Sequence, residues 1–197
     1  MNIIMSGQVI GLADKDAVTR IQELNRLFKN LLDKNEIVQE VVIDGVVYQE
    51  GYNQLLLQNV QTIQEVEIRT INGAALSADI RVNLQEYLPK LIGAFDSISE
   101  IFYGQMRDDD WSYFAQLVEG MQWVVQSVQV LVDQAVRFSS SPLLGVLTVF
   151  IAQSEEQLGQ LEGYMQKKDY TAAGDLIKYE LPNIYQSLFQ SLSEEQA

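Results

Sequence analysis

One stretch of the chain, from Asp108 to Phe138, limits the possible folds more than any other. Its apolar residues recur three and four positions apart, as the buried face of an α-helix requires. They form a first row, Trp111, Phe114, Val118, Met121, Val125, Val128, Val132 and Ala135, and a second row, Leu117, Val124, Leu131 and Phe138. Polar residues gather mainly at Ser112, Glu119, Gln126 and Asp133. Such an apolar helix needs several neighbours to cover it, with the first row as its main seam.

Three further helices are predicted around this central one. The first runs from about residue 77 to 106 and contains Pro89, which removes a backbone donor and should kink it. The next begins at Pro142, after a Ser139–Ser141 turn, and ends where Lys167–Tyr170 breaks the pattern. The last is kinked by Pro182. Because the connections are short, we expect an antiparallel four-helix bundle with up-down-up-down topology.

The N-terminal part of the chain mixes strand and helix patterns. Short apolar runs around Gly7 predict strand structure, and either Asp14 or Asp16 is placed to cap a helix that continues to about Asp33. Two β-branched runs then flank Asp44-Gly45. This dipeptide predicts a β-hairpin, because a type I′ turn needs positive φ at both central positions.

A helical spacing from Tyr52 to Ile63 and an alternating pattern from Val66 to Thr70 complete this part. The predicted order is strand, helix, hairpin, helix, strand, a βαββαβ arrangement of the split β-α-β type with two helices on one face. The turn-forming dipeptide Asn72-Gly73 is a natural boundary between this part and the helices that follow. We therefore predict an α+β protein with a small sheet-and-helix domain over residues 1–72 and a helical bundle over residues 73–197.

The charge balance is strongly acidic. The chain of 197 residues has 27 acidic and 13 basic residues, a formal charge of −14 and a pI near 4.3. Nucleic-acid binding proteins gain affinity by neutralising phosphates with Lys and Arg, and here those residues are few and scattered. We therefore expect no nucleic-acid partner and no attraction to anionic membranes, whereas a basic protein partner suits this charge.

Two further features bear on the compartment of the protein. Cysteine is absent, so no disulfide is available and nothing suggests an oxidising compartment. The N-terminus lacks the pattern of a signal peptide, and the longest apolar run, Pro142–Ala152, is too short to span a bilayer. We expect a cytoplasmic protein.

The absence of histidine removes most catalytic constellations, including serine triads, histidine-ligated zinc sites and di-iron bundles. Neither common nucleotide-binding glycine motif is present. Asp108–Asp110 could ligate a divalent cation, but negative charge at a helix N-terminus explains them better. Glu155, Glu156 and Glu162 fit a solvated helix face. We expect no enzymatic activity, no cofactor and no metal, and a metal-dependent carboxylate enzyme is the least favoured alternative.

A group of apolar residues away from the main seam suggests a docking surface. On the central helix this group comprises Trp123, Val130 and Leu131, and on the last helix Tyr185 and Phe189. One interpretation is that the N-terminal domain or a neighbouring helix covers them. The other is that they form a patch that binds another protein or a second copy of this chain as a homodimer.

The leading functional hypothesis is therefore a non-catalytic protein–protein interaction module, such as an adaptor, an assembly factor or a chaperone-like bundle. The alternative is a small-molecule sensor or carrier. In that case, the ligand would occupy an apolar cleft opened between the helices near Pro89 and Pro182.

Overall fold

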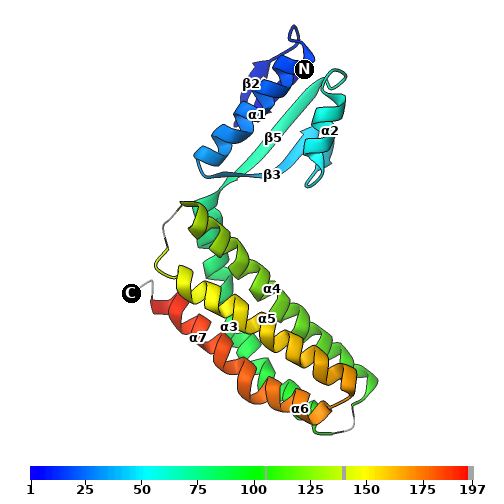
Figure 1. Ribbon diagram of the computed structural model, residues 1–197, viewed down its shortest axis with the longest axis vertical. Helices are drawn as coiled ribbons and strands as arrows, with labels where there is room; N and C mark the ends of the chain where they lie inside the picture. Colours follow the sequence, from blue (N-terminus) through cyan, green and yellow to red (C-terminus); the bar gives the residue numbers. More distant parts are fainter. Residues whose placement is uncertain (105, 139–140, 195–197) are drawn as a thin grey trace. The chain divides into compact units, whose positions relative to one another are not determined.

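The computed structural model describes residues 1–104, 106–138 and 141–194, and it has the predicted α+β fold (Figure 1). The chain divides into two compact units, Met1–Leu76 and Ser77–Ala197. The first contains a five-stranded sheet and the second is helical. Each unit has its own cluster of buried apolar side chains. Most of the predicted Ser139–Ser141 turn and the end of the C-terminal tail lie outside the described residues.

The first unit has seven elements in the order β1, β2, α1, β3, β4, α2 and β5. Their bounds are Asn2–Met5, Gln8–Gly11, Ala17–Asp33, Glu36–Ile43, Val46–Tyr48, Tyr52–Asn59 and Glu65–Asn72. The strand order in the sheet is β2-β1-β5-β3-β4, with β1 and β5 parallel and the other neighbours antiparallel. Side chains from α1, α2 and one face of the sheet form the core of this unit.

This topology corrects the predicted βαββαβ arrangement in two respects. The apolar runs around Gly7 form two strands, β1 and β2, joined as an antiparallel hairpin, so the sheet has a fifth strand. In addition, α1 connects β2 to β3, which run in the same direction but have two strands, β1 and β5, between them in the sheet. Only β4, α2 and β5 form a split β-α-β unit. The first unit is therefore a five-stranded mixed sheet with helices packed against its core face.

Local chemistry explains the elements that were predicted correctly. Asp16 is the N-cap of α1, and its carboxylate accepts a hydrogen bond of 2.8 Å from the backbone N–H of Thr19. Asp44 and Gly45 both have positive φ, 47° and 86°, in the turn between β3 and β4, as the type I′ hairpin requires. The Asp44 carboxylate also accepts from the backbone N–H of Glu65 at 2.7 Å, so this turn is tied to the start of β5.

The second unit is built from three long helices and one divided helical segment. The long helices are α3, α4 and α5, at Gly73–Phe102, Asp108–Phe138 and Leu144–Lys167. The divided segment consists of α6, η1 and α7, at Tyr170–Asp175, Leu176–Glu180 and Leu181–Glu194. Figure 1 shows α4 and α5 side by side, with α7 along α5. No helix within the described residues combines the length and apolar character needed to cross a membrane.

The last segment differs from the single kinked helix that was predicted. Residues Leu176–Glu180 form a π-helical turn, in which the N–H of Leu181 bonds to the carbonyl of Leu176 five residues earlier. The wider turn comes directly before Pro182, which has no N–H to donate and would crowd the carbonyl of an α-helix four residues back. By contrast, α3 continues through Pro89 without interruption.

Burial along α4 also departs from the prediction. The polar positions Ser112, Glu119, Gln126 and Asp133 are exposed as expected. The most buried side chains, however, belong to the second apolar row, Leu117, Val124 and Leu131, together with Met121 and Val128 of the first row. Trp111, at the start of the first row, is 36% exposed. The buried face is therefore rotated relative to the predicted seam, toward the side on which Gly120 allows close contact with α3.

Candidate functional site

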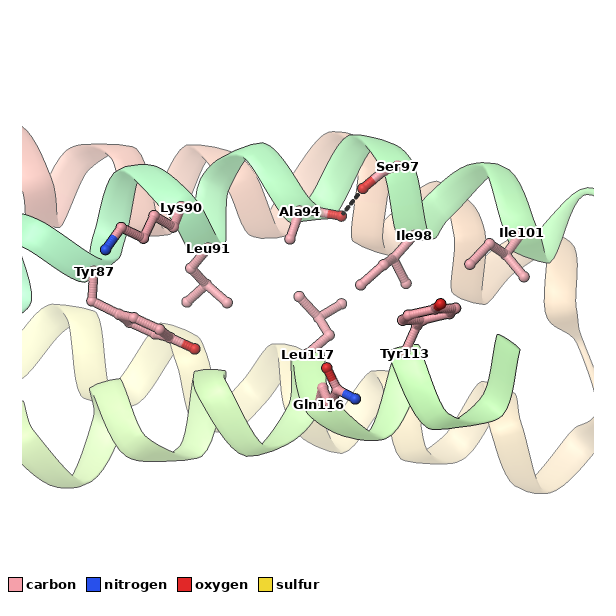
Figure 2. Close-up of a pocket in the computed structure, with 10 residues that line it drawn as sticks. All are labelled: Tyr87, Lys90, Leu91, Ala94, Ser97, Ile98, Ile101, Tyr113, Gln116 and Leu117. Carbon is pink, nitrogen blue, oxygen red and sulfur yellow. Dashed lines mark hydrogen bonds between the residues drawn. The ribbon is translucent and has the colours of Figure 1, made fainter. Parts of the chain in front are cut away.

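A surface groove of about 430 Å³ runs between α3 and α4, and we call it the α3–α4 groove (Figure 2). It is lined by Tyr87, Lys90, Leu91, Ala94, Ser97, Ile98 and Ile101 from α3 and by Tyr113, Gln116 and Leu117 from α4. The tyrosines lie toward its two ends, with Leu91, Leu117 and Ile98 between them (Figure 2). Ala94 and Ser97 are too small to fill the middle. The groove therefore combines aromatic ends with an apolar base.

Trp123 extends the aromatic surface at the Tyr87 end. The indole of Trp123 is 40% exposed and packs edge-to-face on the Tyr87 ring, with 5.0 Å between the ring centroids. The Tyr87 hydroxyl lies directly over Gly120, where a Cβ atom would come within 2.2 Å of it. Gly120 thus lets the tyrosine lie against the backbone of α4 and keep its contact with Trp123.

The structure separates the five predicted patch residues. Trp123 is exposed, and Val130, two turns further along α4, is half-buried. Leu131 is only 3% exposed and Tyr185 is fully buried, so neither is accessible to a partner, which corrects the prediction. Phe189 is half-buried against the core of the helical unit. Of the five residues, Trp123 is the one that is exposed, and the last helix does not present Tyr185 at the surface; a docking patch stays a prediction.

Tyr185 is a core residue because other helices enclose its ring. It makes edge contacts with Phe95 of α3 and Phe150 of α5, at centroid distances of 5.3 and 5.2 Å. Its hydroxyl and the buried Oγ of Ser154 have no hydrogen-bond partner of normal geometry among the described residues. Burial raises the pKa of Tyr185, an effect that the proximity of Ser154 partly offsets. The tyrosine is therefore neutral and inaccessible to solvent.

Several groove residues were not predicted as part of a site. Tyr87 follows the spacing of the apolar residues of α3, so the sequence predicts a core position for it. In the structure it is only partly buried and lies at the edge of the apolar face. Tyr113, which is 55% exposed, lies outside both apolar rows of α4. The available signal was the occurrence of small residues, Ala94, Ser97 and Gly120, within otherwise bulky helices. Small residues on facing helices leave space at the surface or allow close approach.

The lining of the α3–α4 groove holds little charge. Lys90 is its single charged side chain, and it is exposed at the rim near Tyr87 (Figure 2). The Ser97 hydroxyl donates a hydrogen bond of 3.1 Å to the Ala94 carbonyl of its own helix. The lining therefore contains no nucleophile beside a base and no pair of carboxylates, which are the arrangements needed for nucleophilic or acid–base catalysis.

A polar cluster at the far end of α3 has a structural explanation. The Tyr103 hydroxyl donates a hydrogen bond of 2.6 Å to Asp175, which is the main reason that the pKa of Tyr103 is raised to about 12. Lys178 pairs with Glu100, and its ammonium lies 5.8 Å from the centre of the Tyr103 ring. A raised pKa makes Tyr103 a poorer proton donor. We interpret these contacts as a tether between the end of α3 and the π-helical segment.

The acidic run Asp108–Asp110 acts on the helix that it begins. The buried Asp110 side chain accepts a hydrogen bond of 2.8 Å from the backbone N–H of Arg107 and pairs with the Arg107 guanidinium at 3.3 Å. The backbone hydrogen bond is the main cause of the lowered pKa of Asp110. Within the described residues, no cluster of three or more acidic side chains is arranged to hold a metal ion. This geometry agrees with the capping interpretation.

Comparison with known proteins places the helical unit in a family. Residues 79–191 match a family described as a domain of unknown function, DUF8042. All lining residues of the α3–α4 groove, and also Gly120 and Trp123, lie within the matched segment. No curated protein and no solved structure matches the chain. Because the match covers more than half of its length, the chain belongs to the DUF8042 family.

Proposed function

We propose that this protein is a non-catalytic protein–protein interaction module that binds its partner at the α3–α4 groove. The observation that carries the proposal is the aromatic surface around an apolar groove, formed by the exposed Trp123 and Tyr113 and the half-buried Tyr87. Aromatic residues dominate the binding energy of protein interfaces because they bury much area with little loss of conformational freedom.

The shape of the groove supports a helical or extended segment of a partner protein. The α3 residues that line it recur at positions 87, 90, 94, 97 and 101, so it follows the helix for about 21 Å at 1.5 Å per residue. An amphipathic helix presents apolar anchors over that length at i, i+3, i+4 and i+7. In this proposal, Ala94 and Ser97 leave room for one such anchor between the two tyrosines.

The overall charge is compatible with a partner and with a role in the cytoplasm. A net charge of −14 opposes association between two copies of the chain and favours a partner with basic residues near its anchors. We therefore favour a different protein over a homodimer as the occupant. An adaptor or assembly role then follows from the lack of catalytic groups in the groove.

A small-molecule carrier is the second candidate, because the groove volume of about 430 Å³ lies within the range of ligand pockets. The groove also begins beside Pro89, where an opening between helices was expected. The open position of the groove on the surface favours a macromolecule, since small ligands are usually enclosed on most sides.

Replacing Trp123→Asp tests the proposal, with Val136→Asp as the matched control on the same helix. Val136 is 63% exposed and does not line the groove. In affinity capture from lysate of the source cells, we expect Trp123→Asp to lose a stoichiometric partner that Val136→Asp retains. Loss of a central aromatic anchor costs about 2 kcal/mol or more, which is roughly a 30-fold loss in affinity.

A second variant addresses the groove itself. Ser97 lines the groove and is exposed, so Ser97→Trp places a large side chain at its surface, and we expect the same partner to be lost. Native mass spectrometry of the wild-type protein distinguishes a retained small ligand from a protein partner. The proposal is wrong if both variants fold normally and keep every partner and the same assembly state.

A further inference from the structure

A second groove, of about 580 Å³, runs along the other flank of α4, and we call it the α4–α5 groove. It is lined by Phe114, Val118 and Gln122 of α4 and by Glu155, Leu158, Gly159, Leu161, Glu162 and Met165 of α5. The α4 residues recur every four positions, over about 12 Å of helix. None of them lines the α3–α4 groove, so the two grooves are separate surfaces.

The base of the α4–α5 groove is apolar. Leu161 is buried, whereas Phe114, Leu158 and Met165 are half-buried and present part of their surface to solvent. Methionine is flexible and polarizable, and it adapts to the shape of a binding partner. An exposed apolar base of this kind fits the apolar face of an amphipathic helix better than a polar ligand.

The rim of this groove carries negative charge that forms no salt bridge with a cation in the described part of the chain. Glu155 and Glu162 are both exposed and lie seven residues apart on α5, about 10 Å along its axis. Glu162 accepts a hydrogen bond from the neutral amide of Gln166 at 3.0 Å. Within the described residues neither glutamate forms a salt bridge, and the nearest basic residues along α5 are Lys167 and Lys168 at its C-terminal end.

Gly159 opens the groove between these two glutamates. A Cβ atom at this position would meet no other atom within 4 Å, so the helix backbone is accessible from outside. Glycine is less favourable than alanine inside a helix, and close approach by another backbone is one physical reason for its presence. The gap lies four residues after Glu155 and three before Glu162, directly between the two charges.

We propose that the α4–α5 groove binds a cationic amphipathic helix from another protein. The apolar stripe of that helix would cover Phe114, Leu158 and Met165, and Lys or Arg residues seven positions apart would pair with Glu155 and Glu162. The partner is another protein and not a second copy, because two chains of charge −14 repel each other. This proposal concerns a different surface from the α3–α4 groove and does not depend on the function proposed there.

The test uses a defined probe, a fluorescein-labelled 18-residue helix with leucines on one face and lysines on the other. A matched peptide has glutamate in place of every lysine. We expect fluorescence anisotropy to detect binding of the lysine peptide, and no binding of the glutamate peptide, in 0.15 M salt. Absence of measurable binding by the lysine peptide would overturn the proposal.

Two pairs of variants distinguish the groove from the general acidity of the protein. Gly159→Leu places a side chain in the gap, where an added Cβ atom meets nothing within 4 Å, and should weaken peptide binding at least tenfold. Gly93→Leu on α3, where a Cβ atom also meets nothing within 4 Å, should leave binding unchanged. Glu155→Lys with Glu162→Lys should weaken binding more than tenfold and much more than Glu86→Lys with Glu180→Lys. Equal effects within either pair would show diffuse electrostatic attraction and sink the proposal.

Two further measurements separate the two grooves and identify the occupant of the α4–α5 groove. Trp123→Asp should bind the lysine peptide like the wild type, so failure at one groove leaves the other proposal standing. Light scattering of the wild-type protein and of Gly159→Leu tests the alternative occupant. A dimer that disappears only in Gly159→Leu would mean that a second copy fills the groove, and it would overturn our choice of partner.

Discussion

At the scale of single residues, the contact between Gly120 and Tyr87 determines the shape of the proposed site. The tyrosine hydroxyl occupies the space that a side chain at position 120 would need, at 2.2 Å from an ideal Cβ. The same ring makes the edge contact with Trp123. A single missing methyl group in α4 therefore positions two aromatic side chains of the α3–α4 groove.

This contact predicts a strong coupling between Gly120→Ala and Tyr87→Phe. In the wild-type background, Gly120→Ala forces the Tyr87 ring to move. The resulting overpacking destabilises the fold by about 1–3 kcal/mol, which outweighs the roughly 0.5–1 kcal/mol that alanine gains over glycine in helix propensity. After Tyr87→Phe, the nearest remaining atoms are 3.3 Å from the new Cβ and small shifts accommodate it. Urea unfolding of the four proteins should give a coupling energy of about 1 kcal/mol or more. If Gly120→Ala changed the free energy of unfolding equally in the wild type and in Tyr87→Phe, the proposed contact would be wrong.

At the scale of the element, the N-terminus of α4 depends on the contact between Asp110 and Arg107. Asp110 is the third residue of the helix, and its carboxylate returns to the backbone N–H of the residue before the helix. It satisfies a donor that the helix leaves without a partner and places negative charge at the positive end of the helix dipole. The start of the longest helix is thus fixed by one side chain.

The lowered pKa of Asp110 predicts how stability changes with pH. The carboxylate is favoured in the folded state, so its contribution is complete above the unfolded pKa of about 4 and is lost as the pH falls through the lower folded pKa. Asp110→Asn should be less stable than the wild type at pH 7 and lose less stability between pH 4 and pH 2. Urea unfolding across this range measures the difference.

Asp109→Asn is the control for this experiment, because it removes the same charge from the same helical turn and keeps the bond to Arg107. It should follow the wild-type pH profile more closely than Asp110→Asn does. If the two variants have the same profile, the helix dipole alone would explain the effect and the hydrogen bond to Arg107 would not matter.

At the scale of the whole molecule, two separate cores support the two compact units. The first core includes Ile3, Val41 and Ile68, and the second includes Leu88 and Phe95. Each cluster contains only residues of one unit. Segments that share a hydrophobic core unfold together, and these two units have no core in common. We therefore expect each unit to unfold in its own transition.

Calorimetry of two core variants tests this expectation. Ile68→Ala and Leu88→Ala each remove a large buried side chain, at a cost of about 2–5 kcal/mol. Each should lower the Tm of one transition by roughly 10 °C or more and leave the other transition in place. A single transition lowered to the same extent by both variants would mean that the two units unfold together.

Features that depend on neighbouring residues were determined by the sequence itself. The Asp44-Gly45 hairpin, the cap at Asp16 and the bounds of α4 all follow from interactions within a few positions. Turn geometry, capping hydrogen bonds and helical spacing act locally, so they hold whatever else the chain contacts. The α+β class follows from these elements alone.

Other features were decided only when distant segments packed together. The β2-β1-β5-β3-β4 order depends on pairing between the two ends of the first unit, and the same elements would also have allowed the predicted split β-α-β order. The neighbouring helices decide which face of α4 is buried and whether Tyr185 is enclosed. They also form the second wall of each groove. Periodicity indicates that a face is apolar, but only the surrounding helices determine how much of that face is covered.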